Sequence, residues 1–413
     1  MNHVRVLVWF PSYARYYIDI LKSAELKYGI ICKDKSEFGF EANYTNQDDF
    51  NRIIEEYKPD IIFIYNILST NFVVHIPMGI KVVTYCDHFY EQLSLFGTRY
   101  FNQVPVNNYL YMPILNAERL DKDHVLDNAD IRKKIYFAPF VDSLIEKKIE
   151  KCREDEEKYA CDLSVVSHFK NIEYYYWCYN IRSTTMQGRI LMQFISRLVR
   201  LIRNEIINRE TADLDDEWIY RNVKNVFASL DLHKYVKEED SFIHIWFQAV
   251  KFSIISHEYG NIVVDWLIER GYNLKIYGRG WDKDDKYRKH AAGTVEESSD
   301  DLRKLYQYSK INVGTNIIMG IHRRNSECIK NGCLCFQAEA SPKYMASDYR
   351  NFFKDGTDIV VYKNKQELYE KIDYYLLHGQ ERERIIEAGK NVVKQNLDAA
   401  GIVGSIFRKI YES

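Results

Sequence analysis

The sequence predicts a two-domain α/β protein in which each domain is Rossmann-like and one of them carries an added helical region. With 413 residues, the chain is too long for one ordinary hydrophobic core. Short apolar runs rich in β-branched residues alternate with amphipathic stretches, as they do in doubly wound parallel sheets. The alternation occurs on both sides of a charged run, residues 147–158. That run is either a linker or a solvated helix face, and its position favours a domain boundary.

The N-terminal domain is predicted over residues 1–150 from three short apolar runs, each bounded by turn residues. Residues 47–60 place their apolar side chains on one helical face and have a proline near the end. A strand, a helix and a second strand in this order make a βαβ unit. The predicted strands are residues 4–10, 60–66 and 80–86, and residues 133–142 end the region.

The C-terminal domain is predicted over residues 160–390, with a helical insertion at about 171–260. The segment 186–207 repeats its apolar positions every three to four residues, as an amphipathic helix does. We expect residues 391–413 to form a C-terminal helix, with a return to the N-terminal domain left open. The predicted strands are 162–167, 272–281, 310–315, 333–338 and 357–362, and the helices between them are 300–309 and 365–379.

Composition excludes several classes of protein. The net charge of −2 argues against a nucleic-acid partner bound through overall charge. The eight cysteines are scattered without zinc spacing, which favours buried thiols in a reducing compartment. The N-terminus lacks the features of a signal peptide, and no apolar window is long enough for a transmembrane segment. We therefore expect a soluble, cytoplasmic protein.

Two stretches of the C-terminal domain have residues suited to a phosphate-bearing ligand. YGRGW ends the predicted strand segment 272–281, so Gly278, Arg279 and Gly280 form either a close approach to a ligand or a plain tight turn. Arg324 and Glu327 are three residues apart and share a helical face. An arginine there suits a diphosphate and a glutamate suits ribose hydroxyls; the alternative is a surface ion pair.

These segments follow one another in a recognisable series: YGRGW, the GTV turn, LRKLYQYSKINVGT, RNSECIKNGC and FFKDGTDIVVYKNKQELYEKIDYYL. The series resembles the C-terminal half of GT-B glycosyltransferases, above all the "glycosyl transferases group 1" set that includes spore-maturation-type proteins. The resemblance covers roughly residues 272–400. It implies a GT-B fold, in which two Rossmann-like domains face a cleft.

The resemblance also implies roles for individual residues. Glu327 matches the ribose-binding glutamate, Arg324 the basic residue near the diphosphate, and Gly332 the glycine that ends the helix. Where retaining members of this fold often carry a second glutamate, this chain has Met319. The predicted donor-binding set is Gly278, Arg279, Gly280, Thr294, Val295, His322, Arg323, Arg324, Glu327, His168 and Lys170.

The fold places the acceptor, and often the catalytic base, in the N-terminal domain. Asp87 and His88 follow a predicted strand, where ligands bind in open α/β sheets. Either is a candidate general base; alternatively Asp87 caps the next helix and His88 is a half-buried surface residue. His168 and Lys170 follow the strand 162–167 and are candidates for contact with the diphosphate, or are structural.

We therefore expect a metal-independent glycosyltransferase with a nucleotide-diphosphate sugar as co-substrate and no other cofactor. The acceptor is a protein, a lipid-linked molecule or a glycan, and a homo-oligomer is left open. Two Asp-x-Asp sequences, at 213–215 and 282–284, are interpreted as coincidental. Because of Met319, a non-catalytic nucleotide-sugar-binding protein of the same fold is the alternative. A dinucleotide-dependent oxidoreductase is disfavoured, since no GxGxxG follows the first strand.

Overall fold

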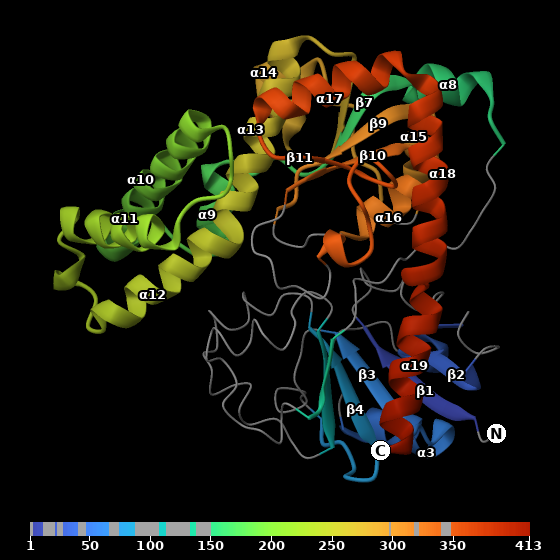
Figure 1. The fold of residues 1–413 in the computed structure, drawn as a ribbon. Coiled ribbons are helices and arrows are strands. Elements are labelled where there is room, and N and C mark those ends of the chain that lie inside the picture. Colours follow the sequence, from blue (N-terminus) through green and yellow to red (C-terminus); the bar gives the residue numbers. More distant parts are fainter. Residues whose placement is uncertain are drawn as a thin grey trace.

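The protein consists of two α/β domains stacked along one axis, with a helical arm on the C-terminal domain (Figure 1). The structure is a computed structural model. It describes residues 3–10, 21–22, 28–39, 47–65, 74–86, 107–112, 133–137, 150–296, 299–317, 322–339 and 348–413.

The N-terminal domain is built on a 6-stranded sheet in the order β2-β1-β3-β4-β5-β6, and all of its strand pairs are parallel. The strands predicted at the start of the chain are confirmed as β1, β3 and β4. Helix α3 (Gln47–Tyr57) buries Phe50, Ile53 and Tyr57, the face that the sequence predicted. The strands are β1 (Val4–Trp9), β2 (Ile30–Asp34), β3 (Ile61–Tyr65), β4 (Lys81–Tyr85), β5 (Asn108–Met112) and β6 (Ile135–Phe137).

Strands β2 and β5 were not predicted from the sequence. The edge strand β2 ends in Lys33 and Asp34. Charged residues on an edge strand disfavour pairing with other chains, and they also interrupt the apolar pattern from which a strand is predicted. The aspartate also caps the short 3-10 helix η2 (Lys35–Phe38), since its side chain accepts a hydrogen bond from the backbone N–H of Ser36. Strand β5 begins with a buried asparagine, Asn108, and lacks a β-branched run.

The C-terminal domain has a 5-stranded parallel sheet in the order β11-β10-β9-β7-β8. Helices α13 and α17 cover one face with the arm, and α15, α16 and α18 cover the other. The strands are β7 (Cys161–Val166), β8 (Leu274–Tyr277), β9 (Ser309–Gly314), β10 (Leu334–Ala338) and β11 (Val360–Tyr362). The helices are α8 (Arg153–Tyr159), α13 (Ile255–Arg270), α14 (Asp285–Arg288), α15 (Asp300–Tyr308), α16 (Arg323–Lys330), α17 (Lys365–Leu377) and α18 (Gly379–Asn396), with short 3-10 turns η6 (Trp281–Lys283) and η7 (Tyr349–Asn351).

The helical arm follows β7 and returns to the sheet through α13 (Figure 1). Its interior is continuous with the core of the C-terminal domain, because Phe194, Ile243 and Trp246 belong to the same buried cluster as the strand residues Leu163 and Val165. A π-helical stretch, η5 (Val250–Ile254), joins the arm to α13. The arm comprises α9 (Ile172–Cys178), α10 (Met186–Arg209), α11 (Asp216–Ser229), η4 (Leu232–Lys234) and α12 (Glu239–Ala249).

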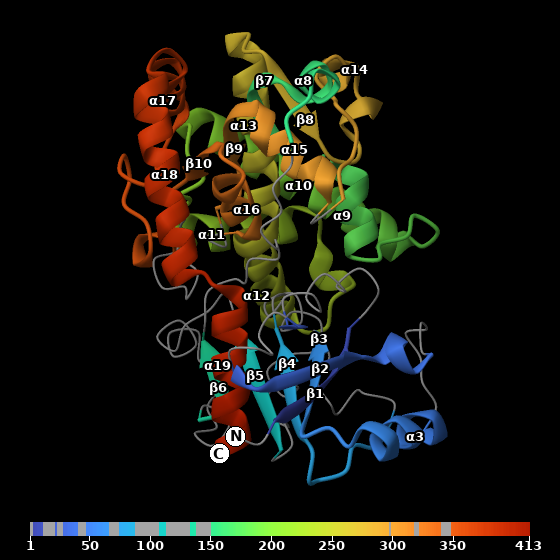
Figure 2. The same ribbon diagram turned by 90° about the vertical axis from the view of Figure 1, so that its right-hand side faces the viewer.

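The chain ends in helix α19 (Ala399–Glu412), which packs in the N-terminal domain. Figure 2 shows α17, α18 and α19 descending along one side of the molecule, from the upper domain to the lower. The ring of Phe407 lies 5.0 Å from that of Phe63 on β3, in an edge-on arrangement. Arg408 donates a hydrogen bond of 2.7 Å to the carbonyl of Tyr28, and Lys81 donates to the carbonyl of Ile410. The last helix is thus part of the N-terminal core.

All eight cysteines are without disulfides. Six are buried, as expected, but Cys152 and Cys178 are exposed. Within the described part of the chain, no helix combines the length and the apolar character that crossing a membrane requires.

Replacing Phe407 by alanine tests how much the stability of the N-terminal domain depends on α19. Because its ring is fully buried against Phe63, Phe407→Ala should lower the free energy of unfolding by about 3–5 kcal/mol. The measurement is urea denaturation followed by circular dichroism. Lys409→Ala, at an exposed position of the same helix, is the matched control and should change stability by less than about 0.5 kcal/mol. Equal effects would contradict this account.

Candidate donor site

The candidate site lies where the strand order of the C-terminal sheet reverses. β7 pairs with β8 on one side and with β9 on the other, although β8 precedes β9 in the chain. In open parallel sheets, ligands bind in the crevice beyond the carboxyl ends of the strands at such a switch point. The segments that follow β7, β8 and β9 supply most of the predicted donor-binding residues.

The segments after β7 and β8 are bonded to each other beyond the ends of the strands. The N–H of Ser167 donates to the carbonyl of Tyr277 at 2.9 Å, and that of Phe169 donates to the carbonyl of Arg279 at 3.0 Å. Between these two bonds, the N–H of Arg279 donates to Nδ1 of His168 at 2.9 Å. Since Nδ1 accepts, the neutral His168 ring carries its proton on Nε2. The structure therefore brings His168 and Arg279 together, as expected.

This pairing requires a glycine at position 278. Gly278 has φ +145°, and a Cβ atom there would lie 1.9 Å from the carbonyl oxygen of Ser167. Its N–H also donates to the carbonyl of Gly293 at 2.8 Å, which brings the turn containing Thr294 beside the end of β8. The Thr294 side chain is exposed there, whereas Val295 packs partly against the core.

Three aromatic rings pack against the bonded segments that follow β7 and β8. Trp281 is fully buried and donates from Nε1 to the carbonyl of Ser167 at 2.6 Å. The Phe169 ring lies 5.0 Å from Trp281 and 5.1 Å from Tyr287, and the last two rings are 4.9 Å apart. The paired loops thus rest on a packed aromatic cluster.

An ion-pair network connects this cluster to the helical arm. The hydroxyl of Tyr287 donates to Asp265 of α13 at 2.8 Å. Arg203 of α10 lies 2.7 Å from the other oxygen of Asp265 and 3.1 Å from Glu258. Burial raises the pKa of Glu258, while Arg203 and the hydroxyl of Tyr175 act in the opposite direction. A hydrogen-bonded path therefore runs from the arm to the loop of the site.

Helix α16 begins at the same edge of the sheet. His322 is its N-cap, accepting at Nδ1 from the N–H of Arg324, while its own N–H donates to Asn325. The Arg324 guanidinium reaches across to the end of β7, where Nη1 donates to the carbonyl of Val166 at 2.8 Å. Arg324 is partly exposed, so a cation stands at the switch point.

Arg323 and Glu327 are the buried charged residues of α16. Glu327 is fully buried, and its carboxylate is 3.5 Å from Nε of Arg323, whose side chain is also buried. The surface ion pair considered for Arg324 and Glu327 does not describe Glu327, because its carboxylate is removed from solvent and is paired with Arg323. Arg324 and Glu327, which the sequence placed on one face, have different surroundings in the structure.

Lys170 lies at the base of the arm. Its Nζ is 4.0 Å from the centroid of the Tyr174 ring, and its carbonyl accepts from Asn261. Burial, with a smaller effect of the positive Lys170, lowers the pKa of His257 to about 3, so that ring is neutral at pH 7. Asp87, His88 and Met319 lie outside the described residues.

The two Asp-x-Asp sequences contribute helix caps. Asp284 accepts from the N–H of Lys286 at the start of α14, and Asp215 accepts from the N–H of Trp218 at the start of α11. Across the described ranges, the structure contains no group of three or more His, Cys, Asp or Glu side chains placed to hold a metal ion.

Sequence reasoning missed a buried amide network beneath the site. Asn325 of α16 donates to the side-chain carbonyl of Gln337 at 2.8 Å, and Gln337 donates to the carbonyl of Asn316 at 2.7 Å. The network joins the carboxyl ends of β9 and β10 to the first turn of α16. Its one sequence signal was a glutamine inside an otherwise apolar strand, CLCFQA, since a buried polar residue needs a partner.

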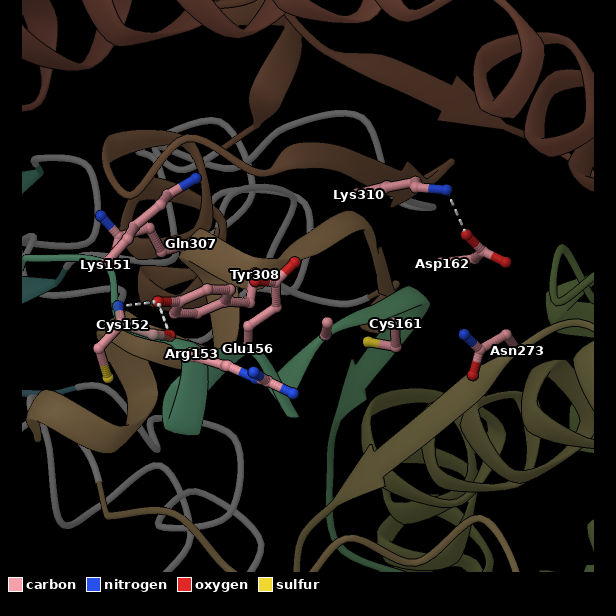
Figure 3. Close-up of a pocket in the computed structure, with 11 residues that line it drawn as sticks. Lys151, Cys152, Arg153, Glu156, Cys161, Asp162, Asn273, Gln307, Tyr308 and Lys310 are labelled. Atoms are coloured by element: carbon pink, nitrogen blue, oxygen red, sulfur yellow. Dashed lines mark hydrogen bonds and ion pairs between the residues drawn. The ribbon is translucent and has the colours of Figure 1, made fainter. Parts of the chain in front are cut away.

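A pocket of about 660 Å³ lies at the opposite, N-terminal edge of this sheet (Figure 3). Its charged groups partly neutralise one another, because Lys310 pairs with Asp162 at 2.6 Å. Tyr308 closes one wall by hydrogen bonding to the backbone of Cys152. Ligands of parallel sheets bind at the carboxyl ends, so this pocket is separate from the candidate site.

Adding a methyl group at position 278 is expected to break the paired loops. Gly278→Ala should destabilise the protein by about 1–3 kcal/mol more than Gly271→Ala, measured by thermal or urea unfolding. Gly271 is the matched control because it also has a positive φ, +81°, but has no atom within 4 Å of an added Cβ. If both variants lose the same stability, steric contact with Ser167 is not the reason for the glycine.

Comparisons with known proteins agree with this geometry. A family described as "Glycosyl transferase-like" matches residues 261–406, less than half of the chain. Among solved structures, HepE from Anabaena, in complex with UDP-glucose, is similar with a TM-score of 0.50 and 11% identity over 100% of both chains. Sucrose-phosphate synthase from Thermosynechococcus elongatus is similar with a TM-score of 0.52 and 7% identity, also over 100% of both chains. No curated protein matches the sequence.

At such low identity, the solved structures establish the fold, and the family match adds the class of the C-terminal domain. The predictions of a GT-B fold and of a glycosyltransferase are confirmed. Residues 261–406 thus match a glycosyl transferase-like family, and the chain as a whole has the GT-B fold.

Proposed function

We propose that the protein transfers a sugar from a nucleotide-diphosphate sugar to an acceptor hydroxyl without a metal ion. The observation that carries the proposal is the position of Arg324, a partly exposed cation whose Nη1 donates to the carbonyl of Val166 at the switch point of the sheet. A guanidinium in this place suits a diphosphate, which needs charge neutralisation and bidentate hydrogen bonds.

Three further features support a diphosphate beside Arg324. Helix α16 begins at this edge of the sheet, where the positive end of the helix dipole favours an anion. His168 holds its ring by accepting from Arg279, so Nε2–H is a donor. Gly278 and Gly280 have positive φ and no side chain, which permits a close approach of the ligand to the backbone.

In the proposed reaction, the bond between the anomeric carbon and the phosphate oxygen breaks, and its electron pair stays with the nucleoside diphosphate. The acceptor oxygen forms the new bond to the anomeric carbon, and its proton passes to a general base. Arg324 stabilises the negative charge that develops on the leaving diphosphate. We propose Asp87 or His88, which follow β4 in the chain, as the base.

We propose that Glu327 binds the ribose of the donor. For this, the nucleotide must reach a carboxylate that is fully buried in the structure. Removing that carboxylate would take an ion-pair partner from the buried Arg323 and cost about 3–5 kcal/mol. A Glu327 variant therefore reports on folding as well as on binding. Arg324, which is partly exposed, is the sharper test.

A screen of UDP-, GDP- and TDP-sugars is expected to identify the donor. The solved complex of HepE with UDP-glucose makes UDP-sugars the first to test. At least one donor should raise the melting temperature and be hydrolysed slowly, as followed by mass spectrometry, with the same result in EDTA. Loss of turnover in EDTA would contradict metal independence. Stabilisation without hydrolysis or transfer to a cell extract would favour the non-catalytic sugar-nucleotide binder, and no stabilisation at all would overturn the proposal.

Substitution of Arg324 is expected to weaken the binding of nucleotides that carry a diphosphate, and not the binding of the nucleoside. Because a hydrogen bond to a charged group contributes about 1.5–3 kcal/mol, Arg324→Ala should bind the nucleoside diphosphate about 10- to 100-fold more weakly, by isothermal titration calorimetry. The affinity for the nucleoside without phosphates should be unchanged. Arg200→Ala, an exposed position on α10, is the control. Equal losses for nucleoside and nucleoside diphosphate would show that Arg324 does not contact the phosphates.

A further inference from the structure

Trp177 is the most exposed tryptophan described in the structure, with 78% of its surface accessible. It lies in the last turn of α9, a helix with the sequence IEYYYWC. An indole exposed to this extent adds nothing to a hydrophobic core, and single exposed apolar residues usually need no explanation. Trp177 is not isolated, however, and its neighbours suggest a binding surface.

Tyr174 and Trp177 form a continuous surface on α9, which we call the α9 aromatic face. The two residues are three positions apart and so share one side of the helix. Their ring centroids are 6.1 Å apart, and Nζ of Lys170 lies 4.0 Å from the Tyr174 centroid. The face thus presents the exposed ring of Trp177 beside the partly buried ring of Tyr174, over which the Lys170 ammonium lies.

The other side of α9 holds the helix in place. The hydroxyl of Tyr175 donates to Glu258 of α13 at 3.0 Å, and Tyr176 shares a hydrogen bond of 2.6 Å with Ser196 of α10. The N-cap Asn171 accepts from the N–H of Tyr174 at 3.1 Å. Because α9 is fixed on its inner side and Tyr174 packs partly against the core, the exposed Trp177 ring is carried by a rigid helix, and little entropy is lost when it binds.

The α9 aromatic face continues directly from the candidate donor site. Phe169, whose N–H bonds to Arg279 in the donor loop, is three residues before the first residue of α9. A molecule bound along α9 therefore has one end close to the donor loop.

We propose that the α9 aromatic face binds sugar units of the acceptor, which is a saccharide chain. Sugar rings offer apolar C–H faces that stack on aromatic rings, and hydroxyls that hydrogen bond to neighbouring polar groups such as Lys170. The proposal rests on the glycosyltransferase function proposed above. It assigns part of acceptor binding to the helical arm of the C-terminal domain.

The size of the face also favours sugar units over a second protein. One aromatic side chain buries roughly 150–250 Å², so two rings fall well short of the roughly 800 Å² that each partner contributes to a stable protein interface. Two adjacent rings match one or two sugar units instead.

The test is binding of the fluorescently labelled protein to a glycan array, followed by titration of the best oligosaccharide against the variants. Wild-type protein should bind a subset of glycans, and Trp177→Ala should weaken that binding about tenfold or more. Trp177→Phe, which keeps a ring, should lose much less. Tyr235→Ala removes a ring that is 38% exposed elsewhere on the arm, and is the control that should bind as wild type does. All variants should keep the thermal shift with the nucleotide-sugar.

No binding by the wild type, or undiminished binding by Trp177→Ala, would overturn the α9 proposal while leaving the donor site untouched. Conversely, glycan binding through Trp177 without a shift by any nucleotide-sugar would overturn the proposed donor and leave the α9 face standing. Size-exclusion chromatography completes the test: a wild-type dimer that becomes a monomer in Trp177→Ala, without glycan binding, would assign the face to self-association and overturn the proposal.

Discussion

The hydrogen bonding between the segments after β7 and β8 is the constraint on which the candidate site depends. It extends the pairing of two parallel strands past their ends, through Ser167, Phe169 and Arg279, and is possible because Gly278 has no Cβ. Loops at a sheet edge are ordinarily variable. Here the backbone bonds fix the place of His168 and of the glycine turn, so the groups proposed to meet the diphosphate are arranged before any ligand arrives.

The helical arm is joined to this arrangement by charge as well as by apolar packing. Arg203 contacts both Glu258 and Asp265, and Asp265 accepts the hydroxyl of Tyr287, whose ring packs under the donor loop. Arg203 is partly exposed while Glu258 is buried, so loss of the arginine would leave the Glu258 carboxylate without this ion-pair partner away from solvent. The arm is therefore an integral part of the C-terminal domain, and its position relative to the loop is determined by named contacts.

Much of the fold could be predicted from periodicity. The runs that became β1, β3 and β4 are apolar because they are buried, and α3 shows its buried face in its spacing. The edge strand β2 was not predicted, because Lys33 and Asp34 interrupt its apolar pattern; Asp34 is buried as the cap of η2. The single closing helix that the sequence suggested is two helices, α18 and α19, and the second belongs to the N-terminal core through Phe407. Periodicity indicates that a face is buried, but not which domain buries it.

The candidate site also has a part that could be predicted from the sequence and a part that could not. By itself, the sequence determined which segments follow the strands, and therefore that Gly278, His168 and Arg324 meet at one edge of a parallel sheet. Tertiary structure alone decided the surroundings of the neighbouring charges. Arg324 bonds to the end of β7 and stays partly exposed, whereas Arg323 and Glu327 are buried together. Helical spacing places side chains on faces of one helix, but burial depends on what packs against each face. For α16 those partners include α18 and the end of β7, which are distant in sequence and close only once the sheet has formed.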